Sequence, residues 1–116
     1  MPKKKKAQRQ VEIFSGQGGQ EPFSQWIESV RVSKSDRAII KLRIRKIVEK
    51  NDFGDHKQLR DADGVSELRF DLGPDYRVYY GEVGSLVIIL TGGDKTTQSE
   101  DIETAKDLWR YQKENK

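Results

Sequence analysis

Cysteine is absent from this chain of 116 residues, and histidine occurs only at His56. Without cysteine the chain has neither disulfide bonds nor thiolate chemistry, so it is compatible with a reducing compartment. A single histidine leaves too few nitrogen ligands for an ordinary zinc site. We therefore do not expect a metalloenzyme.

Long apolar runs are missing as well. No stretch approaches the roughly 18 apolar residues of a membrane-spanning helix, and the basic start MPKKKKAQRQ leads into no apolar signal-peptide core. We expect a cytoplasmic protein without a membrane partner. The length suits one domain with a single modest core.

The charge that is present is unevenly distributed. Residues 1–10 carry +5 and residues 31–50 carry +6, whereas residues 11–30 carry −3 and residues 51–116 carry −5, which gives the net charge of +3. We expect residues 1–10 to form a flexible basic tail and residues 11–116 to form the single domain. Two local basic segments can bind polyanions even when the remaining surface is acidic.

Apolar periodicity predicts the order of the secondary-structure elements. The expected elements are a strand at residues 11–14, helices at 22–30 and 35–50, strands at 65–70, 76–80 and 86–90, and a last helix after a capping box at 97–100. Ser35 is the expected N-cap of the second helix, and Val30 is placed on the apolar face of the first. The turn formers in residues 51–64 predict a loop.

Short links rich in glycine and proline make the three later strands an antiparallel meander. The apolar run LVIIL at residues 86–90 indicates a strand that is buried on both faces. The predicted fold class is therefore α+β, with the order β-α-α-β-β-β-α.

The junction LTGGDKTTQSEDI, residues 90–102, lies where a strand gives way to a helix. It lacks the glycine spacing of a P-loop. Gly92 and Gly93 would allow a sharp turn, and the start of the following helix favours anions. The alternative is a plain turn with Lys95 solvated.

Alternation along the first two meander strands places charged residues on shared faces. Glu67 and Arg69 share one face of their strand, and Arg77 and Tyr79 share one face of the next. Two arginines and an aromatic hydroxyl can then share one surface. The alternative is an ion pair of Glu67 with an arginine on a solvated face of the sheet.

The segments GVSELRFDLGPDYRVYY and ILTGGDKTTQSEDIETAKDL resemble the RelE/ParE superfamily of toxins of type II toxin-antitoxin systems, and most closely its HigB-like addiction module killer branch. The resemblance covers about residues 11–110 and is strongest from Gly64 onward. It implies a RelE-like fold, with two helices against a curved, mostly antiparallel sheet and a C-terminal helix. It also implies an mRNA endoribonuclease, often acting at the ribosome, that a cognate antitoxin silences, here expected to be a helix-turn-helix protein.

By this resemblance, Arg69, Arg77 and Lys95 are the residues that contact phosphate. The RNA 2′-hydroxyl attacks the adjacent phosphorus while fixed cations stabilise the developing charge, so no metal or cofactor is required.

The general acid or base is less defined, because some relatives use a tyrosine where this chain has Ile102. Tyr79, Tyr80 and His56 are the candidates to replace it, and His56 is the better candidate for the base because histidine is the side-chain type that titrates nearest neutrality.

Basic residues on and after the second helix are expected to bind RNA or the ribosome. They are Arg37, Lys41, Arg45, Lys46 and Lys57. The alternative is a helix face whose charges are only solvated. Two other functions remain open: a ParE-like toxin that poisons DNA gyrase by binding, which would arrest replication instead of translation, and a toxin-fold protein that binds nucleic acid without cleaving it.

Overall fold

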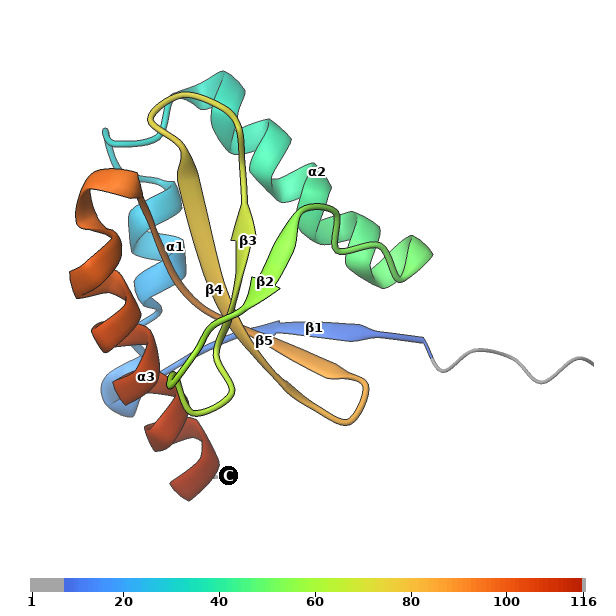
Figure 1. Ribbon diagram of the computed structural model, residues 1–116, viewed down its shortest axis with the longest axis vertical. Coiled ribbons are helices and arrows are strands. Elements are labelled where there is room, and N and C mark those ends of the chain that lie inside the picture. Colours follow the sequence, from blue (N-terminus) through green and yellow to red (C-terminus); the bar gives the residue numbers. More distant parts are fainter. Residues whose placement is uncertain (1–7, 116) are drawn as a thin grey trace, which may run out of the picture.

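The computed structural model of the chain describes residues 8–115, which form a five-stranded sheet and three α-helices (Figure 1). The strands are β1 (Gln10–Ile13), β2 (His56–Gln58), β3 (Ser66–Arg69), β4 (Tyr76–Val83) and β5 (Leu86–Asp94). The helices are α1 (Pro22–Ile27), α2 (Lys34–Lys50) and α3 (Gln98–Glu114), with 3-10 turns η1 (Gln17–Gly19) and η2 (Lys95–Thr97).

The sheet has the strand order β1-β5-β4-β3-β2. β1 runs parallel to β5, and the other neighbouring pairs are antiparallel. The predicted α+β class, with a mostly antiparallel sheet and a meander of β3, β4 and β5, is confirmed. No helix of the described part of the chain is long and apolar enough to cross a membrane.

Helices cover both faces of the sheet, and Figure 1 shows α2 and α3 on opposite sides of the strands. Val87 and Ile89 of β5 pack into the core with α1 and α2, whereas Ile88 and Leu90 pack into the core with α3. All four side chains are buried. The prediction of a strand buried on both faces is therefore confirmed, and double burial explains why this run lacks polar residues.

The segment predicted as the loop 51–64 contains β2, which the sequence analysis missed. β2 is an edge strand of three residues, all polar and all exposed. Such a strand has neither an apolar residue nor an alternating pattern, so only its pairing with β3 identifies it.

The first helix is shorter than predicted. α1 ends at Ile27, and Val30, which the apolar spacing places on the buried face of this helix, is fully exposed. The hydroxyl of Ser29 donates to the carbonyl of Trp26 at 2.6 Å and competes with continued helical bonding.

The second helix begins earlier than predicted and ends as predicted at Lys50. Its N-cap is Ser33 and not Ser35, since the Ser33 hydroxyl accepts from the amide of Asp36. Asn51 adopts a left-handed conformation as the C-cap, which ends the helix.

The domain begins slightly before Val11. Gln10 belongs to β1, and the guanidinium of Arg9 pairs with Glu82 and donates to Asn51. The remainder of the predicted basic tail, residues 1–7, lies outside the described residues.

Candidate functional site

Arg69 and Arg77 are directly opposite each other on β3 and β4, and Glu67 is opposite Tyr79. Opposite residues of an antiparallel pair project from the same face, so these four side chains share one face, as the alternation predicts. It is the face that α3 covers, because Tyr79 packs in the same core as Trp109.

Glu67 lies at the centre of this group and is completely buried. Its carboxylate accepts from Arg69 Nε at 2.8 Å and from Gln98 Nε2 at 3.2 Å, and it lies 4.0 Å from Arg77 Nε. A buried carboxylate requires such partners, because the loss of hydration is otherwise uncompensated. The predicted alternative, an ion pair of Glu67 with an arginine, is thus present, but it is buried and not solvated.

The two guanidinium groups are held differently. Arg69 is bound through Nε, and this hydrogen bond to Glu67 raises its pKa, so it is a permanent cation. Arg77 Nη1 donates to the carbonyls of Asp75 and Tyr76 at 3.3 and 3.2 Å, and its buried Nε has no hydrogen-bond partner within residues 8–115. The Arg69 side chain is 35% exposed and that of Arg77 15%, so Arg77 is the more enclosed.

Both arginines line an open cavity of about 330 Å³. The other lining residues are Asp55, Phe70, Asp71 and Asp75. The cavity therefore combines two fixed cations with a rim of carboxylates. No group of acidic or histidine side chains in the described part of the chain is arranged to hold a metal ion.

The two tyrosine candidates lie on opposite faces of β4. Tyr79 shares the arginine face, but its hydroxyl is buried without a hydrogen-bond partner among the described residues, and burial raises its pKa. Tyr80 packs in the core under α1 and α2, where burial raises its pKa to about 12. Neither hydroxyl is reachable by a substrate.

His56 does not join the arginine pair, which corrects the prediction that it completes the site. It is opposite Leu68 on the neighbouring strand, so it projects from the other face of the sheet. Its ring lies 5.4 Å from that of Phe53, and its Nδ1 is 2.8 Å from the carbonyl oxygen of Gly54. Lys57 is opposite Glu67 and thus projects from the arginine face, at the exposed edge of the sheet.

Lys95 is exposed at the start of η2, directly after β5. Gly93 of β5 is opposite Arg77, so the junction lies at the same end of the sheet as the arginine pair. The Lys95 amide also contacts the carbonyl of Pro74 at 3.5 Å.

The glycines of this junction have a different role from the predicted sharp turn. Gly92 and Gly93 continue β5, and a Cβ atom at Gly92 would collide with the ring of Trp26. A Cβ atom at Gly93 would collide with the carboxylate of Asp101 on α3. These glycines therefore let helices approach both faces of the strand closely.

The capping box is also displaced from its predicted position. It is formed by Asp94 and Thr97 around η2, and not by Thr97 and Glu100. The aspartate accepts from the Thr96 amide at 2.8 Å. The chain is therefore fixed in place immediately before α3.

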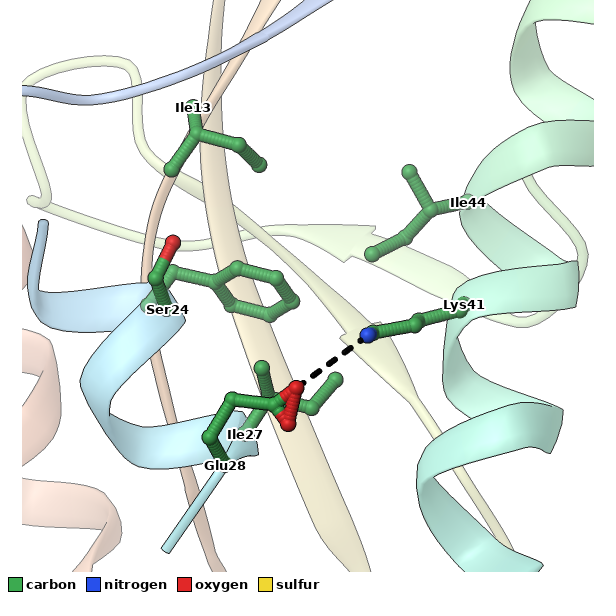
Figure 2. A pocket seen from close by; sticks show the side chains of 7 residues that line it. Ile13, Ser24, Ile27, Glu28, Lys41 and Ile44 are labelled. Atoms are coloured by element: carbon green, nitrogen blue, oxygen red, sulfur yellow. Dashed lines mark hydrogen bonds and ion pairs between the residues drawn. The ribbon is translucent and has the colours of Figure 1, made fainter.

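Helix α2, which carries the predicted basic residues, lies on the face of the sheet opposite the arginine pair. Two of these basic residues form ion pairs with a glutamate. Arg37 Nε and Lys41 Nζ lie 3.2 and 3.4 Å from the carboxylate of Glu28, directly after α1. Figure 2 shows Lys41 reaching toward Glu28. Both residues line an apolar groove of about 250 Å³ between α1 and α2. Arg45 and Lys46 make no ion pair within residues 8–115.

Arg43 is a site residue that the sequence analysis did not single out. Its guanidinium donates to the carbonyls of Phe53, Asp55 and Arg69 and stacks on Phe70 at 4.6 Å. It thereby ties α2 to the rim of the arginine cavity, and burial lowers its pKa. Its spacing of three residues from Ile40 indicates a core-facing position, so the helical period could have revealed it.

Gln98 is a second site residue that the sequence does not reveal, because Glu67, which accepts its hydrogen bond, is 31 residues away in sequence.

Comparison with known proteins gives one informative similarity. A protein of Haemophilus influenzae described as uncharacterized is 44% identical over 85 residues, which cover 72% of this chain and 82% of that protein. No family model matches the chain, and no solved structure matches it.

Proposed function

This chain belongs to the same family as the uncharacterized Haemophilus influenzae protein, and we propose that it is a RelE-like toxin of a type II toxin-antitoxin system, in the HigB-like branch. Its activity is metal-independent cleavage of mRNA in the cytoplasm, at the ribosome, and a helix-turn-helix antitoxin neutralises it. The observation that carries this proposal is the cross-strand pair of Arg69 and Arg77, fixed on a rigid sheet beside an open cavity.

The arrangement suits stabilisation of a phosphoryl transition state. Nε of Arg69 is occupied by Glu67, and its two terminal nitrogens make no hydrogen bond within residues 8–115. Arg77 is anchored by two carbonyls on one side of its guanidinium. Fixed planar donors of this kind match phosphate oxygens, and donors that are already oriented need no rearrangement as charge develops. Lys95 supplies a third cation at the same end of the sheet.

A second candidate function is supported by the surroundings of the proton-transfer candidates. His56 projects from the other face, and Tyr79 is buried. These features favour a toxin-fold protein that acts by binding, either to nucleic acid or to DNA gyrase.

Expression of the chain without a partner tests the proposal. We expect growth to stop because translation stops, so pulse labelling should show a loss of amino-acid incorporation before any loss of thymidine incorporation. Purified protein should cleave ribosome-bound message in a buffer whose only divalent metal ion is the magnesium that ribosomes require. Arrest of DNA synthesis with protein synthesis intact would replace this function with the gyrase-binding alternative.

A further inference from the structure

Glu67 has the most enclosed charged side chain at the arginine site. It is completely buried, yet it contacts three separate elements: Arg69 on its own strand, Arg77 on β4 and Gln98 at the start of α3. One oxygen accepts from Arg69, and the other accepts from Gln98 and faces Arg77 Nε. This carboxylate is therefore the common contact of both guanidinium groups and α3.

The environment of Glu67 argues against a role as the general base. A general base must lie within hydrogen-bond reach of the hydroxyl that it deprotonates. Both oxygens of Glu67 are occupied by donors from the protein, and its side chain has no solvent-exposed surface. A buried carboxylate with these partners is suited to holding its neighbours in place.

We propose that Glu67 is a positioning residue that orients Arg69 and Arg77 toward phosphate and, through Gln98, sets the position of α3 against them. The inference rests on the proposed function for the statement that these arginines bind phosphate. The contacts of Glu67 can be measured without RNA. The start of α3 directly follows η2, so the same link places Lys95 relative to the pair.

Glu67→Gln keeps the shape of the side chain, but it removes the negative charge and replaces one of the two accepting oxygens with an NH2 group. One of the donors that now contact Glu67 therefore loses its acceptor. Removal of a carboxylate beside two arginines strengthens their attraction for RNA, so KM should be unchanged or lower. Loss of orientation should slow the chemical step, and kcat should fall by about tenfold to a hundredfold. A residue that served stability alone would lower the apparent kcat only by lowering the folded fraction, so kcat should be calculated per folded molecule from an unfolding curve of the same sample. After that correction, a purely structural role predicts a wild-type kcat.

Hydrogen exchange of the arginine Nε protons, followed by NMR, gives a readout that does not require RNA cleavage. In Glu67→Gln, the Arg69 proton should exchange about tenfold faster or more than in wild type at a temperature below unfolding. Glu82→Gln is the matched control, because Glu82, at the far end of β4, also pairs with an arginine, Arg9, which directly precedes β1. This control should leave the exchange of Arg69 and Arg77 unchanged.

Wild-type exchange rates in folded Glu67→Gln would overturn the proposal, as would equal effects of the control. If Glu67→Gln does not fold, Gln98→Ala tests the same network by removing one donor, and unchanged Arg69 exchange in that variant would also overturn it. A wild-type protein with protected arginine protons that cleaves no RNA would instead remove only the proposed function. The two failures are thus distinguishable.

Discussion

At the scale of single residues, the two arginines have unequal freedom. Arg77 is enclosed, and two backbone carbonyls hold its Nη1. Arg69 is more exposed and is held through Nε alone. A guanidinium held in one orientation by a rigid sheet contributes position as well as charge. We therefore expect the loss of Arg77 to harm chemistry more than binding.

Arg77→Lys keeps the charge but lacks the planar fork, so the cleavage rate should fall well below wild type. Arg77→Ala should lower the rate further, by about two to three decades, as for a lost transition-state donor. Single-turnover cleavage of a ribosome-bound message and thermal unfolding should be measured for each variant. Arg110→Lys, an exposed change on α3, is the control.

The competing explanation makes Arg77 only a structural partner of Glu67. In that case Arg77→Ala and Glu67→Ala would lose cleavage rate equally and in proportion to lost stability. That result would remove Arg77 from the active site.

At the scale of elements, α2 carries two kinds of cation. Arg37 and Lys41 bind Glu28 and help join α2 to α1. Arg45 and Lys46 lie further along the helix and make no ion pair within the described ranges. Only the second pair has its full charge available to a polyanion, so the four cations predicted to bind RNA are not equivalent.

Arg45→Gln combined with Lys46→Gln should weaken RNA binding and reduce the salt slope of the binding constant by about 1 to 2, because each lost phosphate contact removes about one released counterion. Arg37→Gln with Lys41→Gln is the matched comparison and should change the slope less. Binding should be measured across a range of salt concentrations, with unfolding curves to show that both variants fold. An unaltered slope in the first variant would assign the helix face to simple solvation.

At the scale of the whole molecule, the sheet has a core on each face, and β4 contributes buried tyrosines to both cores. Tyr79 lies under α3, and Tyr80 lies under α1 and α2. Burial raises the pKa of both hydroxyls, to about 12 for Tyr80. The folded state therefore holds both protons more tightly than the unfolded chain, whose tyrosines titrate near pH 10.

Stability should be insensitive to these tyrosines below pH 10, where both states keep the protons. Between pH 10 and about 12 the unfolded chain loses protons that the folded protein retains, so the free energy of unfolding should fall by about 1.4 kcal/mol per pH unit for each tyrosine. Urea unfolding across this range would measure the slope. Tyr80→Phe should make it shallower, and Tyr79→Phe should do so independently. A constant free energy of unfolding up to pH 12 would contradict this expectation.

Several features of this protein depend only on local periodicity and can be predicted from the sequence. The α+β class, the meander, the doubly buried β5, the end of α2 and the shared face of Arg69 and Arg77 all follow from spacings within one element or one hairpin. Side chains that alternate along a strand, or recur along a helix, must face the same way in any fold that keeps the element.

Which of these faces come into contact depends on how separate elements pack together. The sequence offers His56 as a candidate general base for the arginine site, but the pairing of β2 with β3 turns it to the other face. Gly92 and Gly93 were expected to form a turn, but they make room for residues of α1 and α3. The contact between Glu67 and Gln98 joins segments distant in the chain. Local sequence does not predict these contacts, because they arise only when separate elements pack to bury their apolar faces.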